Sequence, residues 1–362
     1  MSSTIAADVS ASSSDQQDQS DIELIRDLVA VESRSGGERE AVDYLVEEMT
    51  QRGFDAHVDP AGNAVGRIGS GDRHVVLLGH IDTVPGRIPV RIEDGVLFGR
   101  GSVDAKGPLA TFVAAAARAA DRLSCRVSVV GAVGEESMGS PGAHQVATWA
   151  APDLCVIGEP SGWDAVCLGY RGSLTLSYRL TQGSRHTAGP GRSAAEQAIA
   201  FWNALTGELT GRNEAASGEF QRISPTIRAF NTTADGLTEV ARLDLGLRLP
   251  PGVDVEGLIT AVRGLATGTE VTVDGFQHGY RSDKRSPLSP PFLRAIRAEG
   301  GTPRFNVKLG TSDMNVVGPV WGCPIVAYGP GDASLDHTPN EHIVLDEYLR
   351  GIRVLASVLA SL

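Results

Sequence analysis

Two adjacent glutamates, Glu135 and Glu136, follow an apolar, glycine-punctuated run that ends at Val133. Adjacent like charges repel and resist burial unless a cation lies beside them. One interpretation is an exposed loop that simply ends in two acidic residues. The other is a metal site, in which one carboxylate binds the ion and its neighbour is free to move a proton. The rest of the chain must decide between them.

Histidines and carboxylates also follow the other apolar runs of the chain. They are His80 and Asp82 after Val75–Leu78, Asp104 in a glycine-containing loop, Glu159 after Leu154–Ile157, and His337 after Ile325–Tyr328. In open α/β sheets the site lies outside the carboxyl ends of the strands, so we expect these side chains to converge. Each one alone is more typical of a structural residue or a solvated loop. Together they form a nitrogen and oxygen ligand set suited to zinc or a similar ion.

The elements that would position these residues alternate between helices and continuous apolar strands, which predicts a mixed, largely parallel sheet between helices. A hairpin is expected from two short strands around a turn at 59–63. We expect helices at 20–31, 38–52, 108–122 and 143–149, and strands at 54–58, 64–68, 75–78, 127–133 and 154–157. The fold class is therefore α/β.

A second pattern interrupts this one. Strands at 174–180, 226–230, 239–249 and 270–276 with helices at 193–205 and 255–265 give the order β-α-β-β-α-β of a ferredoxin-like domain. The α/β character returns after Ser286, with a helix at 292–299, strands at 305–308 and 325–328, and a last helix from 345. We expect a disordered tail at 1–20, a catalytic domain at 21–172 and 286–362, and an inserted lid and dimerisation domain at 173–285.

Composition limits the partners and the compartment. The formal net charge of -12 argues against nucleic acid or an anionic membrane as a general partner. No apolar run approaches the length of a membrane span, and residues 1–20 lack the features of a secretory signal. Four cysteines without a CxxC pair are typical of reduced, buried thiols. A soluble, cytoplasmic protein is the expectation.

Five short motifs in order make the chemistry more specific. HIDTVP (80–85), GRGSVDAKG (99–107), GEES (134–137), GEP (158–160) and GPGDASLDHTPNE (329–341) resemble the motif series of the M20 family of dinuclear zinc hydrolases. The resemblance runs from about residue 22 to the C-terminus and includes the inserted domain. It implies two divalent metal ions, with zinc the first choice and cobalt the alternative.

The resemblance also implies roles for single residues. His80, Asp104 and Glu159 match the ligands of one ion, and Asp104, Glu136 and His337 match those of the other, with Asp104 bridging. Glu135 falls on the general base of the family, and Asp82 on the carboxylate that orients the imidazole of His80. Under this interpretation Glu136 holds metal while Glu135 moves a proton.

Residues of the inserted domain and its surroundings complete the implied site. His186 matches a lid histidine that reaches the site of the partner subunit in a homodimer and stabilises the tetrahedral oxyanion. Asn231 and Arg248 fall on positions that contact substrate in relatives. Gly310, Thr311 and Ser312 resemble a substrate-binding loop, although a helix N-terminus capped by Thr or Ser fits these residues equally well.

The stretches 79–110 and 308–315 resemble most closely one branch of the family. That branch releases lysine or ornithine from the C-terminal glutamate of a small acidic amino-group carrier protein in amino-acid biosynthesis. The alternatives are an N-acetyl-ornithine or N-acetyl-lysine deacetylase, or another aminoacylase or dipeptidase of the family. A carrier would need a local basic surface, and the richest candidate comprises Arg281, Lys284, Arg285, Arg294, Arg297, Arg304 and Lys308, which would otherwise be a solvated basic face.

Other classes fit less well. A dinucleotide-binding loop is excluded because Asp104 stands where the third glycine of the fingerprint belongs. A serine hydrolase would need a G-x-S-x-G turn, which the chain lacks. A non-catalytic zinc protein would be expected to lack the base or a ligand, whereas all of these positions are filled.

Overall fold

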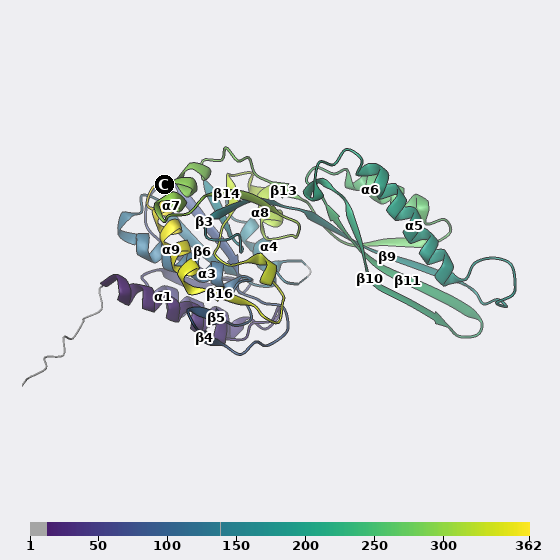
Figure 1. Ribbon diagram of the computed structural model, residues 1–362, viewed down its shortest axis with the longest axis horizontal. Coiled ribbons are helices and arrows are strands. Elements are labelled where there is room, and N and C mark those ends of the chain that lie inside the picture. The colour runs from purple at the N-terminus through teal and green to yellow at the C-terminus, as the bar shows by residue number, and fades with distance from the viewer. Residues whose placement is uncertain (1–12, 138) are drawn as a thin grey trace, which may run out of the picture. The chain divides into compact units, whose positions relative to one another are not determined.

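The computed structural model describes residues 13–137 and 139–362, and the chain divides into two units (Figure 1). The first unit contains the chain up to Cys167 together with Lys284–Phe305 and Cys323–Leu362. The second contains Leu168–Asp283 and Asn306–Gly322.

The first unit is built on a mixed sheet with the strand order β1-β2-β6-β3-β7-β15-β8. Strands β6, β3, β7 and β15 run parallel to one another, whereas β1, β2 and β8 pair antiparallel with their neighbours. This confirms the predicted fold class. The bounds are β1 Asp55–Val58, β2 Ala64–Ile68, β3 His74–His80, β6 Arg126–Ala132, β7 Leu154–Gly158, β8 Ala165–Tyr170 and β15 Ile325–Ala327.

Helices cover this sheet. Helix α3 packs against β3, β6 and β7, and α1 and α9 pack on α3 in turn. Because α3 has neighbours on several sides, nearly all of its residues are buried, which explains its apolar and alanine-rich sequence. The helices are α1 Ser13–Ala30, α2 Arg39–Gln51, α3 Lys106–Ala119, α4 Pro141–Ala147, α7 Ser289–Ala298 and α9 Leu345–Leu359.

Short elements complete the first unit. A separate three-stranded sheet has the order β16-β5-β4, and its pairing brings the segment after His337 beside the segment before Asp104. Neither β4, β5 nor β16 was predicted. These elements are β4 Arg91–Glu93, β5 Val96–Phe98 and β16 His342–Val344, with short 3₁₀ helices at Ala120–Arg122 and Ala333–Leu335.

Helix α1 corrects the predicted tail. It begins at Ser13, so residues 13–20 are helical where disorder was predicted, and residues 1–12 lie outside the described part of the chain. The cause is tertiary: the fully buried carboxylate of Asp21 accepts hydrogen bonds from Arg52 at 2.6 Å and Arg118 at 2.7 Å. Arg118 also donates to Asp18 at 2.5 Å. Asp18 and Asp21 thereby anchor this end of α1 to Arg52, at the end of α2, and to Arg118 of α3.

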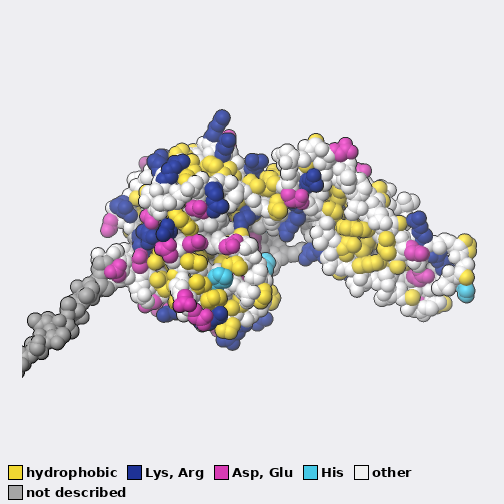
Figure 2. All heavy atoms as spheres, in the orientation of Figure 1, with side chains coloured by type: hydrophobic (Ala, Val, Ile, Leu, Met, Phe, Trp, Pro, Cys, Tyr) yellow, Lys and Arg dark blue, Asp and Glu magenta, His cyan; other side chains and the backbone are white. Residues whose placement is uncertain are grey.

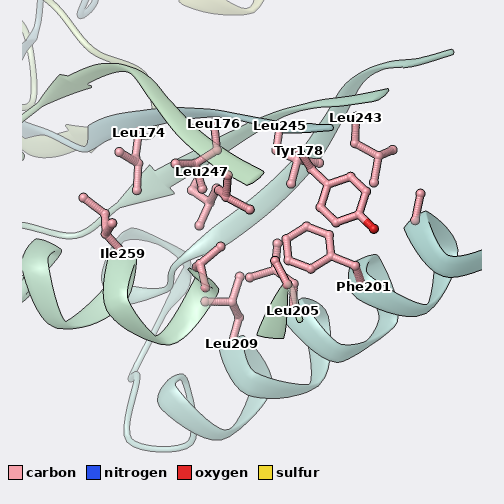
Figure 3. Close-up of a cluster of buried hydrophobic side chains, with 14 of the residues drawn as sticks. Leu174, Leu176, Tyr178, Phe201, Leu205, Leu209, Leu243, Leu245, Leu247 and Ile259 are labelled. Carbon is pink, nitrogen blue, oxygen red and sulfur yellow. The ribbon is translucent and has the colours of Figure 1, made fainter. Parts of the chain in front are cut away.

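The second unit contains the predicted ferredoxin-like arrangement. Its sheet has the order β10-β11-β9-β12 with every pair antiparallel, and α5 and α6 lie on one face of it (Figure 1). Alternate residues of β9 and β11 face these helices and form an apolar core in which Tyr178 and Phe201 stack at 4.5 Å (Figure 3). The bounds are β9 Gly172–Gly183, α5 Ala194–Arg212, β10 Ser224–Ala234, β11 Thr238–Leu249, α6 Val255–Leu265 and β12 Glu270–Gln277.

Residues 306–322 belong to the second unit, whereas the sequence predicted them in the catalytic domain. They contain the end of β14 (Arg304–Lys308) and α8 (Met314–Trp321), and they follow β13 (Tyr280–Arg281) along the chain. The Asn315 side chain donates to the backbone carbonyls of Arg171 at 3.2 Å and His278 at 2.6 Å. These long-range bonds, which a local pattern cannot reveal, hold the segment to the second unit.

Among residues 13–137 and 139–362, no helix combines the length and hydropathy that a membrane span needs. The four cysteines are free thiols, and Cys125, Cys155 and Cys167 are buried.

Candidate metal centre and catalytic site

The ends of the central strands carry the predicted ligands. His80 is the last residue of β3, Glu136 follows β6, and Glu159 follows β7 directly. His337 lies in the loop after β15, and Asp104 lies just before α3. Two groups with ligand atoms within 4.8 Å of one another result, namely His80, Asp104 and Glu159, and Asp104, Glu136 and His337. The structure therefore brings all five residues together on the first unit.

Asp104 lies between the two histidines. Its Oδ1 is 3.3 Å from Nε2 of His80, and its Oδ2 is 3.0 Å from Nε2 of His337. Glu159 Oε1 lies 4.0 Å from the same nitrogen of His80, and Glu136 Oε1 lies 2.8 Å from that of His337. One carboxylate thus faces both groups, as a bridging ligand must.

The cluster favours positive charge. Hydrogen bonds to Asp104 and then to Glu136 raise the pKa of His337 to about 10. Burial alone would lower the pKa of His80, but its contacts with Asp104 and Asp82 outweigh burial and raise it well above the usual value. The same histidines hold the pKa of Asp104 far below its ordinary value against the opposing effect of burial. The acidic side chains of the cluster therefore outnumber its two histidines, even when both histidines are protonated. Such an excess of negative charge favours the binding of a cation.

Asp82 is fully buried and makes contacts in two directions. Its Oδ1 lies 3.5 Å from Nδ1 of His80, and its backbone oxygen lies 3.0 Å from the same nitrogen. Its two carboxylate oxygens accept the backbone N–H groups of Glu135 and Glu136, each at 3.0 Å. Asp82 thus fixes both the imidazole and the start of the acidic loop, whereas the sequence predicted only the first contact.

Both adjacent glutamates face the cluster. Glu135 belongs to a third group, with His80 and Glu136, whose ligand atoms lie within 4.8 Å of one another. Glu136 has a side chain that is only 10% exposed. These contacts favour the metal-site interpretation of the pair over the solvated loop. The division of roles between the two carboxylates stays a prediction.

The predicted residues of the second unit differ in exposure, because His186, Asn231 and Arg248 are exposed whereas Ser312 is buried. His186 lies in the loop after β9 and accepts a hydrogen bond at Nδ1 from the backbone of Ala188. Arg248 on β11 donates from NH1 to the Thr311 hydroxyl at 3.4 Å. Ser312 is fully buried, and its hydroxyl accepts the N–H of Met314, the first residue of α8, while Asp313 occupies the N-cap position.

Asn231 and Arg248 lie far apart on one face of the second unit's sheet. Asn231 on β10 pairs with Arg242 of β11, and directly opposed residues share a face. Arg242 and Arg248 are six residues apart on β11, which corresponds to about 20 Å along a strand. His186 is near the Asn231 end, because Ser184 N–H donates to the carbonyl of Leu237 in the β10–β11 turn at 2.8 Å. His186 and Asn231 therefore lie apart from Arg248 along the sheet.

Two residues that hydrogen-bond to Asp82 or to Asp104 were not singled out from the sequence. Ser35 donates to Asp82 at 2.7 Å across 47 residues of chain. Glu341 accepts the backbone N–H of Asp104 at 3.0 Å. Glu341 is the last residue of the fifth motif, four positions after the candidate ligand His337. An acidic residue at that position was the sequence feature that could have identified it.

Comparison with known proteins gives consistent matches. The model of peptidase family M20/M25/M40 matches residues 76–361. The chain is 46% identical over 350 residues to a LysW-lysine hydrolase of Deinococcus radiodurans, covering 94% of this chain and 96% of that protein. It is 29% identical over 326 residues to a LysW-lysine/LysW-ornithine hydrolase of Sulfurisphaera tokodaii, covering 90% of each.

A solved M20 family metallo-carboxypeptidase from Sulfolobus solfataricus superposes with a TM-score of 0.77 at 18% identity, covering 94% of this chain and 98% of that one. At that identity the likeness concerns the fold alone.

Proposed function

Because this chain belongs to peptidase family M20/M25/M40 and is a hydrolase, we propose that it releases lysine, or ornithine, from an amino-group carrier protein. The bond cleaved is the amide that joins the amino acid to the C-terminal glutamate of the carrier. The names of the Deinococcus radiodurans and Sulfurisphaera tokodaii relatives support this substrate. The observation that carries the chemistry is the pair of three-residue groups that share Asp104.

The donor set fits two divalent ions, zinc or cobalt. Imidazole nitrogens and carboxylate oxygens are the ligands that these ions accept, and the raised pKa of both histidines marks a site that favours cations. His80, Asp104 and Glu159 would hold one ion, and Asp104, Glu136 and His337 the other. Such ions polarise a carbonyl and make bound water acidic at neutral pH.

The chain's own groups would then move the proton. Glu135 lies beside His80 and Glu136 and is the proposed general base, taking a proton from the attacking water and passing it to the leaving amine nitrogen. Asp82 keeps Glu135 in place through the backbone bond at 3.0 Å. The imidazole of His186 would donate a hydrogen bond to the oxyanion that forms at the amide carbon.

We also propose a homodimer in which His186 reaches the partner's site, and in which His186 and Asn231 act at a different site from Arg248 and Thr311. The separation of about 20 Å along β11 between Arg242, which pairs with Asn231, and Arg248 supports this division, because it exceeds the reach of an amino-acid-sized group. The exposed edge strand β10 offers unpaired backbone groups that a second copy would cover.

The acidic carrier would dock on exposed basic residues near α7. Lys284, Arg285, Arg294 and Arg297 are exposed on the first unit, whose surface around α7 and α9 carries Lys and Arg among Asp and Glu (Figure 2). Arg304 pairs with Asp164 at 2.6 Å, which reduces its share in docking. Arg281 and Lys308 belong to the second unit, so the seven predicted residues do not form one surface within a single unit.

The test is a substrate comparison with the purified chain loaded with zinc and, separately, with cobalt. We expect release of free lysine or ornithine from the aminoacylated carrier, with kcat/KM far above that for N-acetyl-lysine and N-acetyl-ornithine. The isolated carrier C-terminal peptide bearing lysine is the matched control for docking. Equal or higher kcat/KM on the acetylated amino acids would contradict the proposal and favour a deacetylase.

A further inference from the structure

The carboxylate of Glu341 is fully buried, and both of its oxygens accept hydrogen bonds. Its Oε1 accepts two consecutive backbone N–H groups, those of Val103 and Asp104, each at 3.0 Å. Its Oε2 accepts from NH1 of Arg100 at 2.6 Å. The Glu341 side chain is 0% exposed and that of Arg100 13%. A single acidic side chain therefore holds the whole turn that leads to Asp104.

The surrounding backbone fixes Glu341 in this place. The pairs His342↔Phe98 and Ile343↔Leu97 join β16 to β5, and the carbonyl of Glu341 accepts the N–H of Gly99 at 3.3 Å. Gly101 turns the loop at a φ of 86°, in the region that favours glycine, and its carbonyl accepts the N–H of Lys106 at 2.9 Å. The loop around Asp104 thus rests on Glu341 rather than on a helix or strand of its own.

Glu341 also lies four residues after His337 on the same loop. Asp104 and His337 face each other across 3.0 Å, so Glu341 links the two segments that carry them.

We propose that Glu341 is a positioning residue that sets the carboxylate of Asp104 for both metal groups. It acts through the backbone of Val103 and Asp104, and Arg100 supplies the positive charge that allows a carboxylate to be buried there. Removal of Glu341 leaves two buried N–H groups without an acceptor, and the turn moves to find water. This inference rests on the proposed metal centre.

The consequence is specific because Asp104 belongs to both groups. Loss of Glu341 weakens both ions together. Loss of Glu159, which belongs to one group, or of Glu136, which belongs to the other, weakens mainly one. A general loss of stability would not separate these patterns.

The experiment measures cobalt(II) binding to the metal-free full chain by visible absorption and by equilibrium dialysis, with the thermal midpoint of the metal-free protein measured alongside. We expect Glu341→Ala to weaken both ions by about ten- to a hundredfold, the range for residues that orient metal ligands. Glu341→Gln keeps an oxygen for the two N–H groups but turns an amide toward Arg100, so its affinity falls between wild type and Glu341→Ala.

Asp21→Asn is the matched control. It also exchanges a fully buried, arginine-paired carboxylate for its amide, but Asp21 contacts none of the ligand residues. We expect it to lower the thermal midpoint and to leave cobalt affinity at the wild-type value.

The outcomes separate the two proposals. Wild-type chain that binds fewer than two cobalt ions contradicts the metal centre itself. Two ions in wild type with unchanged affinity in folded Glu341→Ala overturns the role of Glu341. Equal loss of affinity in Asp21→Asn also overturns it, because the effect would then follow stability.

Discussion

The candidate metal ligands and the candidate substrate contacts differ in how one chain gathers them. Five ligand residues from distant parts of the sequence meet on the first unit, with polar atoms 2.8–4.0 Å apart. The residues predicted to bind substrate lie on the second unit, where His186, Asn231 and Arg248 are exposed, and Asn231 and Arg248 lie about 20 Å apart along a sheet. Buried parallel strands bring their ends to one edge, whereas a half-exposed antiparallel sheet spreads its surface residues along its length.

The difference suggests a division of labour. The ligands need a rigid, crowded place, which buried β3 and β6 provide. The substrate contacts need an open surface that a partner can approach, which the uncovered face of the second unit's sheet provides. The following experiments test each side of this comparison, beginning with the largest expected effect.

Glu135→Gln tests the candidate metal centre on the first unit. The amide cannot accept the proton from water, so we expect kcat to fall by at least about a hundredfold while both metals stay bound. Measured zinc content, set beside that of Glu136→Ala, separates the two glutamates. Metal loss as large as in Glu136→Ala would reverse the assignment of base and ligand.

Mixing two inactive variants tests the substrate contacts predicted on the second unit. His186→Ala should lose about a hundred- to a thousandfold in kcat, as expected for removal of an oxyanion donor. After subunit exchange with Glu135→Gln, we expect about a quarter of wild-type activity, because half of the dimers are mixed and each has one intact site. Exchange is followed with differently tagged chains. Proven mixed dimers without recovered activity would show that His186 does not act on the partner's site.

Asp82→Asn tests whether the hydrogen bonds of Asp82 hold the metal ligands in place. The carboxylate accepts two backbone N–H groups and the Ser35 hydroxyl, and an amide nitrogen cannot replace an accepting oxygen. We expect metal affinity to fall by about ten- to a hundredfold. Titration of the metal-free protein with zinc and a competing chelator measures it. Ser35→Ala, which removes one donor only, should have a smaller effect, and the opposite order would argue against this explanation.

Lys284→Ala combined with Arg285→Ala should have the smallest effect. We expect KM for the carrier-linked substrate to rise several-fold at low salt, and the difference to shrink as salt rises, since exposed charges are screened within about 8 Å at physiological ionic strength. Turnover of N-acetyl-lysine is the internal reference. A parallel loss on both substrates would indicate a structural role for these residues.

Much of the first unit could be predicted because its strands are continuous apolar runs with polar residues at their ends. The hairpin β1–β2, the strand β3 and the helix α2 fall within a few residues of their expected bounds. The elements that were missed depend on distant partners. Helix α1 begins early because Asp18 and Asp21 meet Arg118, nearly a hundred residues away. Helix α8 contains Pro319, a residue that usually argues against a helix.

The candidate site shows the same limit. His80, Asp104 and Glu159 could be named from motif positions, and their convergence followed from sheet topology. The contacts of Asp82 with the backbone of Glu136, and of Glu341 with that of Asp104, could not be named. They depend on loop conformation, which residue types alone do not determine.

The placement of β15 has a consequence for synthesis on the ribosome. Strand β15 lies between β7 and β8 in the sheet, although most of the second unit separates it from them along the chain. A nascent chain that has emerged through Asp283 already carries His80, Asp104 and Glu159, but neither β15 nor His337. The gap between β7 and β8 therefore stays open until almost all of the chain has been translated. One ion could find its three residues early, while the other must wait for the final segment to enter the sheet.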